Sequence, residues 1–292
     1  MIPPAILEGI TDFFQTGSNQ PAQILSFHPV SGGSINQAFQ IKTNHGNFFL
    51  KYKDASRFPQ MFQKEAKGLE LLRNSGTVNV PEVLLAAEAG KHSFLLMEFI
   101  NSAPMKDDFW DDFGKSLAAL HSHKAEKIGL GHDNFMGSLV QQNNFHESWI
   151  TFFIEERLEP QVKHALEKNA ISKTDILAFE RLYQKLGDIF PKVSPTLLHG
   201  DLWSGNFMVN HQGKPCLFDP AVYYGHPEID IAMTTLFGGF NQRFYEVYNR
   251  HNPLEKGWQY RLDIYNLYPL MIHLNLFGGG YLGAVRRILG GF

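Results

Sequence analysis

The sequence predicts an α+β protein with two unequal lobes, a small N-terminal lobe built on an antiparallel sheet and a larger, mainly helical lobe. Three observations predict this class. Strand-like apolar runs dominate residues 23–101, one helical pattern interrupts them, and helical patterns dominate from residue 104 onward. The stretch Asn101-Ser102-Ala103-Pro104 interrupts both patterns, so we place the two lobes at residues 1–101 and 102–292.

The first lobe is expected to contain short strands separated by turns, with one key helix. The strands are AQILSFHPV, INQAFQIKT, GNFFLKYK and SFLLMEFIN. Turn residues lie at Ser31-Gly32-Gly33 and at Asn44-His45-Gly46-Asn47. In the helix expected over residues 57–73, the apolar positions share one face; they are Phe58, Met61, Phe62, Leu69 and Leu72.

The second lobe carries successive helical patterns around two short strand-like pieces. The helical positions are Phe109, Phe113, Leu117 and Leu120; Trp149, Phe152 and Phe153; and Leu177, Leu182 and Leu186. The strand-like pieces TLLHGD and FMVN precede KPCLFDP. The uncharged segment 264–285 is long enough to span a membrane, but its Asn, His, Pro and Gly residues favour a buried helix ending in a turn.

Composition excludes several classes of protein. With 43% hydrophobic residues and 25 Phe, the chain fills a core and is not disordered. The formal charge of −3 lacks the positive excess that drives phosphate-backbone binding, so we expect no nucleic-acid partner. The single cysteine, Cys216, excludes an internal disulfide and fits a reducing compartment. The N-terminal stretch has no basic region of a secretory signal, and we expect a cytoplasmic protein.

The most informative stretch is HGDLWSGN, which begins at His199 and follows an apolar, strand-like run. It places Asp201 and Asn206 five residues apart, and Asp219 follows on a predicted hairpin. Two carboxylates and an amide in this order can surround a divalent cation and an incoming hydroxyl, as phosphoryl transfer requires. The alternative is an Asp-rich turn with a capping Asn.

A second feature is a carboxylate on an apolar helix face. Glu65 falls in line with Met61, Leu69 and Leu72, and a buried carboxylate requires a partner. Lys51, at the end of the preceding strand, is the natural candidate for an ion pair that orients phosphate. The alternative is that both side chains are solvated and never meet.

Two further segments fit a nucleotide site. The loop that contains Gly32, Gly33, Ser34 and Asn36 lets backbone N–H groups approach phosphate, although Gly-Gly between strands is also an ordinary turn. Neither GxGxxG nor the P-loop pattern is present. The apolar strand with Met97, Glu98 and Phe99 ends at the lobe boundary, where adenine could meet the backbone; a plain core strand is the alternative.

The order of these features resembles the protein-kinase-like fold. Asp219-Pro220-Ala221 replaces DFG and no APE signature follows, which is closer to the aminoglycoside phosphotransferase and choline kinase branch. From end to end the chain resembles the fructosamine/ketosamine-3-kinase family. The matching motifs are Gly32-Gly33-Ser34-Ile35-Asn36; Phe62 with Glu65-Ala66 and Gly68-Leu69; Trp149 to Phe153 with Arg157-Leu158; His199 to Asn206; and Asp219-Pro220-Ala221 with Tyr224 to Met233.

This resemblance implies ATP-dependent phosphorylation of the sugar 3-hydroxyl of ketoamines on small amines or protein lysines, after which the unstable adduct is lost. It implies roles for single residues: Asp201 as general base, Asn206 and Asp219 as Mg²⁺ ligands, Lys51 with Glu65 as phosphate anchor, and Met97, Glu98 and Phe99 as adenine hinge. Trp203, His226 and Asp230 are candidates for the acceptor pocket, with a core, capping or bracing role as the alternative for Trp203 and Asp230. Helical spacing favours a core role for Trp149 over contact with substrate.

Three other functions stay open at this point. The chain could phosphorylate another small hydroxylated molecule, or act as a non-catalytic nucleotide-binding scaffold. A metal hydrolase built from His199, Asp201 and Asp219 is disfavoured because the 13 His are scattered and form no HExxH pattern. Monomer and homodimer fit the sequence equally.

Overall fold

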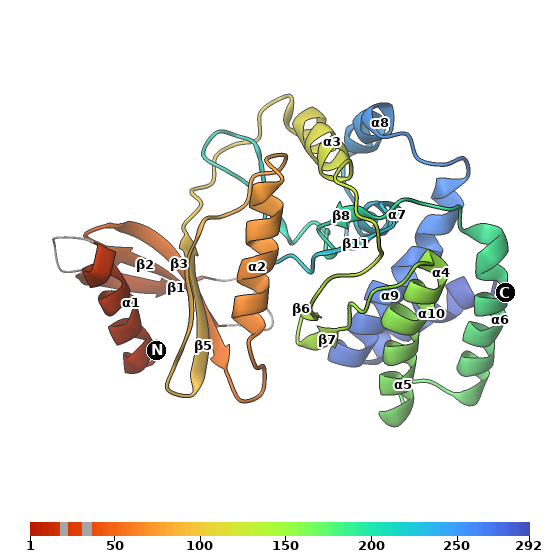
Figure 1. The fold of residues 1–292 in the computed structure, drawn as a ribbon, viewed down its shortest axis with the longest axis horizontal. Helices are drawn as coiled ribbons and strands as arrows, with labels where there is room; N and C mark the ends of the chain where they lie inside the picture. The colour runs from red at the N-terminus through yellow and green to blue at the C-terminus, as the bar shows by residue number, and fades with distance from the viewer. Residues whose placement is uncertain (18–22, 31–36) are drawn as a thin grey trace. The chain divides into compact units, whose positions relative to one another are not determined.

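The computed structural model describes residues 1–17, 23–30 and 37–292 (Figure 1). The chain packs as two compact units. The first contains Met1–Lys106 and Met208–Asp219, and the second contains Asp107–Phe207 and Pro220–Phe292. An antiparallel sheet in the first unit and a mainly helical second unit confirm the predicted α+β class.

The first unit is built on a five-stranded antiparallel sheet in the order β1-β2-β3-β5-β4. The strands are β1 (Ile24–Pro29), β2 (Gln37–Thr43), β3 (Gly46–Asp54), β4 (Val83–Ala89) and β5 (His92–Glu98). Two helices, α1 (Pro4–Gly17) and α2 (Met61–Asn74), lie against opposite faces of it (Figure 1). Because side chains alternate along a strand, each face presents a different set of residues to its helix.

The face toward α1 forms an apolar core. Ile6 and Ile10 of α1 pack in one cluster with Leu50 and Tyr52 of β3 and Leu96 of β5. Helix α1 and strand β4 were not predicted from the sequence. The opposite face meets α2, and its buried positions Met61, Phe62, Leu69 and Leu72 lie on the apolar face predicted for this helix. The predicted helix was too long at its start, because α2 begins at Met61 and Phe58 lies before it.

A hairpin far along the chain belongs to the first unit. Strands β9 (Phe207–Val209) and β10 (Pro215–Leu217) pair, and Asn79 forms a parallel bridge with Cys216. The Asn79 side chain donates to the carbonyl of Pro215 (3.1 Å), and the Leu217 N–H donates to the carbonyl of Asn79 (2.8 Å). The sequence-based division assigned this hairpin to the larger lobe. These hydrogen bonds join segments more than a hundred residues apart, so no local sequence pattern reveals them.

The second unit surrounds one long helix, α9 (Trp258–Phe277), which is buried on nearly all sides. Its other elements are α3 (Phe109–Leu120), β6 (Asn134–Met136), β7 (Leu139–Gln141), α4 (Trp149–Phe152), the π-helix η1 (Phe153–Leu158), α5 (Glu159–Glu167), α6 (Lys173–Ile189), β8 (Thr196–Leu198), β11 (Tyr223–Gly225), α7 (Glu228–Met233), α8 (Gln242–His251), η2 (Gly279–Tyr281) and α10 (Leu282–Leu289). Among the described residues, no helix has the length and apolar character that crossing a membrane requires. The uncharged segment 264–285 is accordingly a core helix with its terminating turn, as predicted.

Candidate active site

The first unit contains a buried lysine held by two carboxylates. Lys51 lies in β3, between Ala38 of β2 and Leu95 of β5, so its side chain points away from the α1 core toward α2. Its ammonium forms ion pairs with Glu65 of α2 and with Asp219, the latter at 2.6 Å between Nζ and Oδ1. The Lys51–Glu65 pair predicted from helix spacing is confirmed.

Burial decides the electrostatics of this group. Burial alone would lower the pKa of Lys51, but the charges of Asp219 and Glu65 outweigh it and hold that pKa above its ordinary value. Burial raises the pKa of Glu65 to about 7, against the opposing effect of Lys51. The Lys51 side chain is only 3% exposed, whereas that of Asp219 is 45% exposed, so the carboxylate of Asp219 is the solvent-facing member.

Asp219 also has an unusual backbone. Its φ of 52° lies in the left-handed region, which residues other than glycine rarely adopt. Such strain persists where the surrounding structure over-determines it and clusters at functional sites. Here the ion pair to Lys51 and the neighbouring strand β10 fix the position of this carboxylate.

The predicted adenine hinge lies at the end of β5 in the same unit. Met97 is buried and paired with Phe49 and Val83, while Glu98 is exposed and Phe99 half-buried. The Glu98 N–H donates to the carbonyl of Glu82 (2.8 Å). Recognition of adenine by the backbone would therefore use other groups of this segment. The predicted glycine loop with Gly32, Gly33, Ser34 and Asn36 lies outside the described residues.

The second unit contains the loop that carries Asp201 and Asn206. Asn206 Nδ2 donates both to the backbone carbonyl of Asp201 (2.8 Å) and to its carboxylate (2.9 Å), so the two predicted site residues are in contact. The N–H of Asn206 donates to the carbonyl of Trp203 (3.0 Å), and the N–H of Trp203 donates to that of Asp201 (3.2 Å). These bonds close the loop on itself and fix the Asp201 side chain.

The start of this loop depends on a glycine. Gly200 has φ of 84°, and a Cβ placed on it would lie 2.0 Å from the carbonyl oxygen of Ala221. The Ala221 N–H donates in turn to the carbonyl of His199 (2.9 Å). Only glycine allows this close approach between the loop and Ala221, which lies two residues before β11.

Asp230 holds the start of the same loop through hydrogen bonds to its backbone. It is fully buried in α7, and its carboxylate accepts the N–H groups of His199 (2.7 Å) and Gly200 (2.8 Å). His121 Nε2 lies 3.2 Å from the same carboxylate, and His121 Nδ1 lies 2.7 Å from the hydroxyl of Tyr248. Burial alone would raise the pKa of Asp230, but these hydrogen bonds and the nearby histidines lower it. Of the roles considered for Asp230, bracing the loop is the one these contacts support.

The other acceptor-pocket candidates lie in different surroundings. Trp203 is half-buried, with its ring edge-on to Phe237. His226 is 2% exposed and packs between Trp149 and Tyr265. Burial, together with the charges of Arg261 and His121, lowers the pKa of His226 to about 3. His226 is therefore a core residue, packed between two other aromatic side chains.

The helical segment with Trp149 and Arg157 is also core. Trp149 is 5% exposed, in line with the core role that helical spacing favours. Arg157 is fully buried, with its guanidinium 4.0 Å from the ring centre of Tyr223. It donates to the carbonyl of Gln142 (2.6 Å) and to Asn143 Oδ1 (2.7 Å). The buried guanidinium of Arg157 therefore holds together the segment with Gln142 and Asn143 and the ring of Tyr223 inside the second unit.

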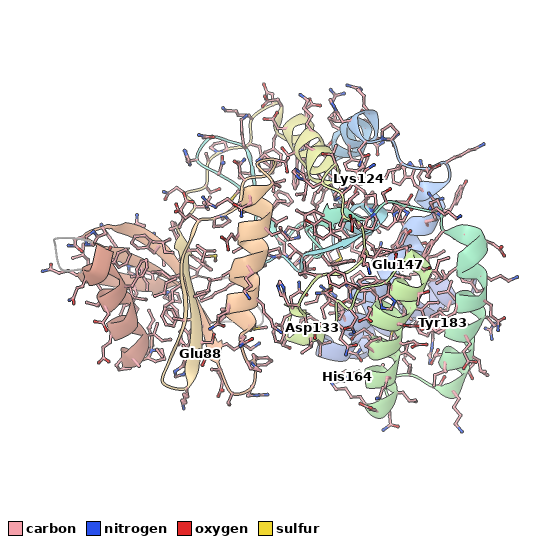
Figure 2. All side chains as sticks on the ribbon, in the orientation of Figure 1. Glu88, Lys124, Asp133, Glu147, His164 and Tyr183 are labelled. Carbon is pink, nitrogen blue, oxygen red and sulfur yellow. The ribbon has the colours of Figure 1, made fainter. Side chains whose placement is uncertain are left out.

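Sequence reasoning missed several residues beside the loop. Phe237 lies next to Trp203, with His273 and Tyr281 around Phe237, and the pair of His121 and Tyr248 extends the brace. The only local signal for the first set is Gly238-Gly239 after Phe237, which indicates a turn. A separate groove of about 830 Å³ lies between α5 and α6, and Figure 2 shows the half-buried His164 and Tyr183 on these two helices, both lining it.

Magnesium prefers oxygen ligands, and the candidate ligands supply them. Because Asn206 Nδ2 donates to Asp201, the amide is oriented, and its oxygen is the group left to act as a ligand. The half-exposed carboxylate of Asp219 provides the second candidate. The donor chemistry of both residues fits a Mg²⁺ ion.

Comparison with known proteins gives one consistent result. A family model described as fructosamine kinase matches residues 7–291. A probable ketoamine kinase of Enterococcus faecium is 44% identical over 266 residues, which cover 90% of this chain and 94% of the relative. A chloroplastic protein-ribulosamine 3-kinase of Arabidopsis thaliana is 36% identical over 275 residues, which cover 91% of this chain and 82% of the relative.

Solved structures agree with these sequence matches. The crystal structure of a candidate fructosamine-3-kinase from Haemophilus somnus has a TM-score of 0.87 at 30% identity and covers 97% of this chain and 96% of its own. A choline kinase of Streptococcus pneumoniae has a TM-score of 0.62 at 19% identity, with 98% and 99% covered, and shows the fold alone. The predicted kinase-like fold is confirmed.

Proposed function

Because the chain belongs to the fructosamine kinase family, we propose that it transfers the γ-phosphoryl group of ATP to the sugar 3-hydroxyl of ketoamines. The acceptors are fructosamine, ribulosamine or erythrulosamine adducts on small amines or on protein lysines. The observation that carries the proposal is the buried Lys51 ammonium, held by Glu65 and Asp219. A fixed, desolvated cation of this kind suits phosphate oxygens.

The proposed roles divide between the two units. Residues 1–101 would bind ATP, with Lys51 and Glu65 anchoring its phosphates and the segment with Met97, Glu98 and Phe99 next to adenine. Residues 102–292 would bind the acceptor, with Asp201 orienting the 3-hydroxyl and receiving its proton. Since phosphoryl transfer depends mainly on alignment, the hydrogen bonds that fix Asp201 matter more than its basicity.

Magnesium completes this proposal. Oxygens of Asn206 and Asp219 are its proposed ligands, and the ion would offset charge on the phosphate oxygens. The products are ADP and a ketoamine 3-phosphate, whose breakdown frees the amine. We place the activity in the cytoplasm, where ATP is available and where the free, buried Cys216 stays reduced.

The test is ADP release from Mg-ATP with a panel of ketoamines, compared with choline, aminoglycoside and free-sugar acceptors. Turnover is expected with ketoamines and is expected to disappear in Asp201→Asn, which preserves the shape of the side chain. A ranking that puts the other acceptors first would favour a different small-molecule kinase. ATP binding without transfer to any acceptor would favour a scaffold.

A further inference from the structure

A group of three amide side chains is buried in the second unit, apart from the residues assigned to transfer. We call Asn134, Gln141 and Asn143 the amide group; they lie in β6, at the end of β7 and two residues after it, and none is more than 4% exposed. Gln141 Nε2 and Asn143 Nδ2 both donate to Asn134 Oδ1, at 2.7 Å and 3.1 Å. Because burying an unpaired amide costs free energy, the other partners of these side chains show what the group holds in place.

Arg157 and Tyr268 fix the direction of these hydrogen bonds. A guanidinium only donates, so the oxygen of Asn143 faces Arg157 (2.7 Å) and its Nδ2 faces Asn134. Tyr268 of α9 donates its hydroxyl to Gln141 Oε1 (2.9 Å), which leaves Gln141 Nε2 as the donor on the other side. The two N–H groups of this Nε2 therefore have set directions, one toward Asn134 and one toward a backbone carbonyl.

The amide group holds the segment that follows Asp219. Gln141 Nε2 donates to the carbonyl of Ala221 (3.0 Å), and Asn134 Nδ2 donates to the carbonyl of Val222 (2.7 Å). Buried side chains thus bind two consecutive carbonyls just before the chain continues into β11. Because β11 is only three residues long, these two bonds add to the few that fix the backbone ahead of it.

Ala221 in turn supports the start of the loop with Asp201. Its N–H donates to the carbonyl of His199 (2.9 Å), and its own carbonyl oxygen lies where a Cβ on Gly200 would be only 2.0 Å away. Asp230 binds the N–H groups of the same two loop residues. The backbone just before Asp201 is therefore held between the Asp230 carboxylate and the Ala221 peptide. Any shift of the Ala221 carbonyl would be passed to the residue that precedes Asp201.

The partner of Gln141 on α9 also lies near the charge of Asp201. Tyr268 is fully buried, and burial raises the pKa of its hydroxyl, against the effect of Arg157; the charge of Asp201 adds to the increase. The hydroxyl therefore stays protonated at neutral pH and keeps donating to Gln141. The amide group and the loop thus belong to one connected part of the second unit.

We propose that Gln141 is a positioning residue for phosphoryl transfer: by holding the Ala221 carbonyl, its Nε2 fixes where the loop presents Asp201 to the acceptor hydroxyl. This inference rests on the proposed function and adds to it a buried residue that acts through the backbone. Phosphoryl transfer depends on alignment, and a displacement of about 1 Å can cost about 100-fold in rate. Loss of the Gln141 hydrogen bonds should therefore lower kcat, whereas KM for ATP, which is assigned to the first unit, should not change.

The first test compares substitutions of two buried glutamines. Gln141→Met keeps the length of the side chain and removes its hydrogen bonds, so kcat for a ketoamine should fall at least about tenfold, with KM for ATP unchanged within about twofold. Gln161→Met is the matched control: Gln161 in α5 is 5% exposed, and its Oε1 accepts from Asn275 of α9 (3.0 Å), a bond between two helices rather than to the loop. Its kcat should stay within about twofold of wild type, although both variants should unfold at lower urea concentrations. Equal kcat in the two variants would overturn the inference and leave a merely structural role.

Two further measurements do not depend on that comparison. Tyr268→Phe keeps the ring and removes only the hydroxyl that orients the Gln141 oxygen, so it should fold even if Gln141→Met does not. Its kcat should fall about two- to fivefold, and an unchanged kcat would overturn the inference. Hydrogen exchange of the peptide with residues 197–206 needs no substrate and should be faster in both variants than in Gln161→Met. Equal exchange there would overturn the positioning role, whereas failure of the wild type to phosphorylate any ketoamine would refute the proposed function.

Discussion

The two units bury a charged site residue in opposite ways. In the first, the Lys51 cation is neutralised by carboxylates, Glu65 and Asp219. In the second, the Asp230 anion accepts hydrogen bonds from the N–H groups of His199 and Gly200 and from the His121 ring. Charge pairing holds a group ready to meet phosphate, whereas hydrogen bonding holds a backbone in place. Substitutions in the two regions should therefore change activity and stability in different ways.

The largest effect is expected for Lys51→Met, which removes the charge and keeps the bulk. Loss of one desolvated cation from the proposed phosphate site should lower kcat/KM by about 10³-fold. It also leaves Glu65 buried without its partner, so its pKa rises above the present value of about 7. Steady-state kinetics measures the first effect and urea unfolding the second.

The stability loss in Lys51→Met should depend on pH in a defined direction. The native state then holds a proton on Glu65 that the unfolded chain, with the ordinary pKa of 4.5, releases. Relative to wild type, in which Glu65 already releases its proton with a pKa of about 7, the added loss therefore appears above pH 7 and reaches about 1.4 kcal/mol at pH 8. The double variant Lys51→Met/Glu65→Leu should lose this pH dependence. A pH-independent loss would contradict the description of Glu65.

Asp230→Ala should destabilise the second unit, and the loss in the free energy of unfolding should not become smaller at low pH. It leaves the N–H groups of His199 and Gly200 and the His121 ring without their acceptor, at about 1 kcal/mol or more each. We expect a loss of about 3 kcal/mol in the free energy of unfolding at both pH 5 and pH 7. Activity should fall together with stability, because Asp201 follows the two amides directly. A stable variant with normal kcat would show that the loop holds its shape alone.

Local sequence patterns were enough to predict some of the contacts in these two regions. The Lys51–Glu65 pair could be predicted because a carboxylate on an apolar helix face needs a partner, and the nearest basic strand residue supplies it. The contact between Asp201 and Asn206 likewise follows from five residues of spacing. The predicted roles of these residues in transfer stay predictions until the kinetic tests are made.

Other features have no local signal. The bond from Asn79 to Pro215 and the contact between Phe237 and His273 join segments that only the folded chain brings together. Asp230 could be a substrate residue, a cap or a brace from sequence alone, since nothing nearby reveals that it accepts hydrogen bonds from residues about thirty positions earlier.

A smaller effect is expected from His226, a buried group of the second unit that is neutral rather than charged. Its Nδ1 accepts the N–H of Glu228 (3.2 Å), a bond that protonation would remove. With a pKa of about 3 in the folded state and 6.5 ordinarily, the unfolded chain takes up the proton first as pH falls. Stability should therefore drop by about 2 kcal/mol between pH 7.5 and pH 5. His226→Gln, which keeps an acceptor and does not titrate, should remove this part of the pH dependence; an unchanged slope would contradict it.

The smallest effect tests how far the brace extends from Asp230. Since the Asp230 carboxylate only accepts, His121 Nε2 donates to it, and the other ring nitrogen, Nδ1, lies 2.7 Å from the Tyr248 hydroxyl, which itself accepts from Asn252 (3.0 Å). Tyr248→Phe ends this chain of bonds at His121 and should cost about 1 kcal/mol. If the chain positions Asp201, kcat should fall about two- to fivefold while KM for ATP is unchanged, because ATP is assigned to the first unit. A change in stability alone would limit the brace to Asp230 and its direct donors.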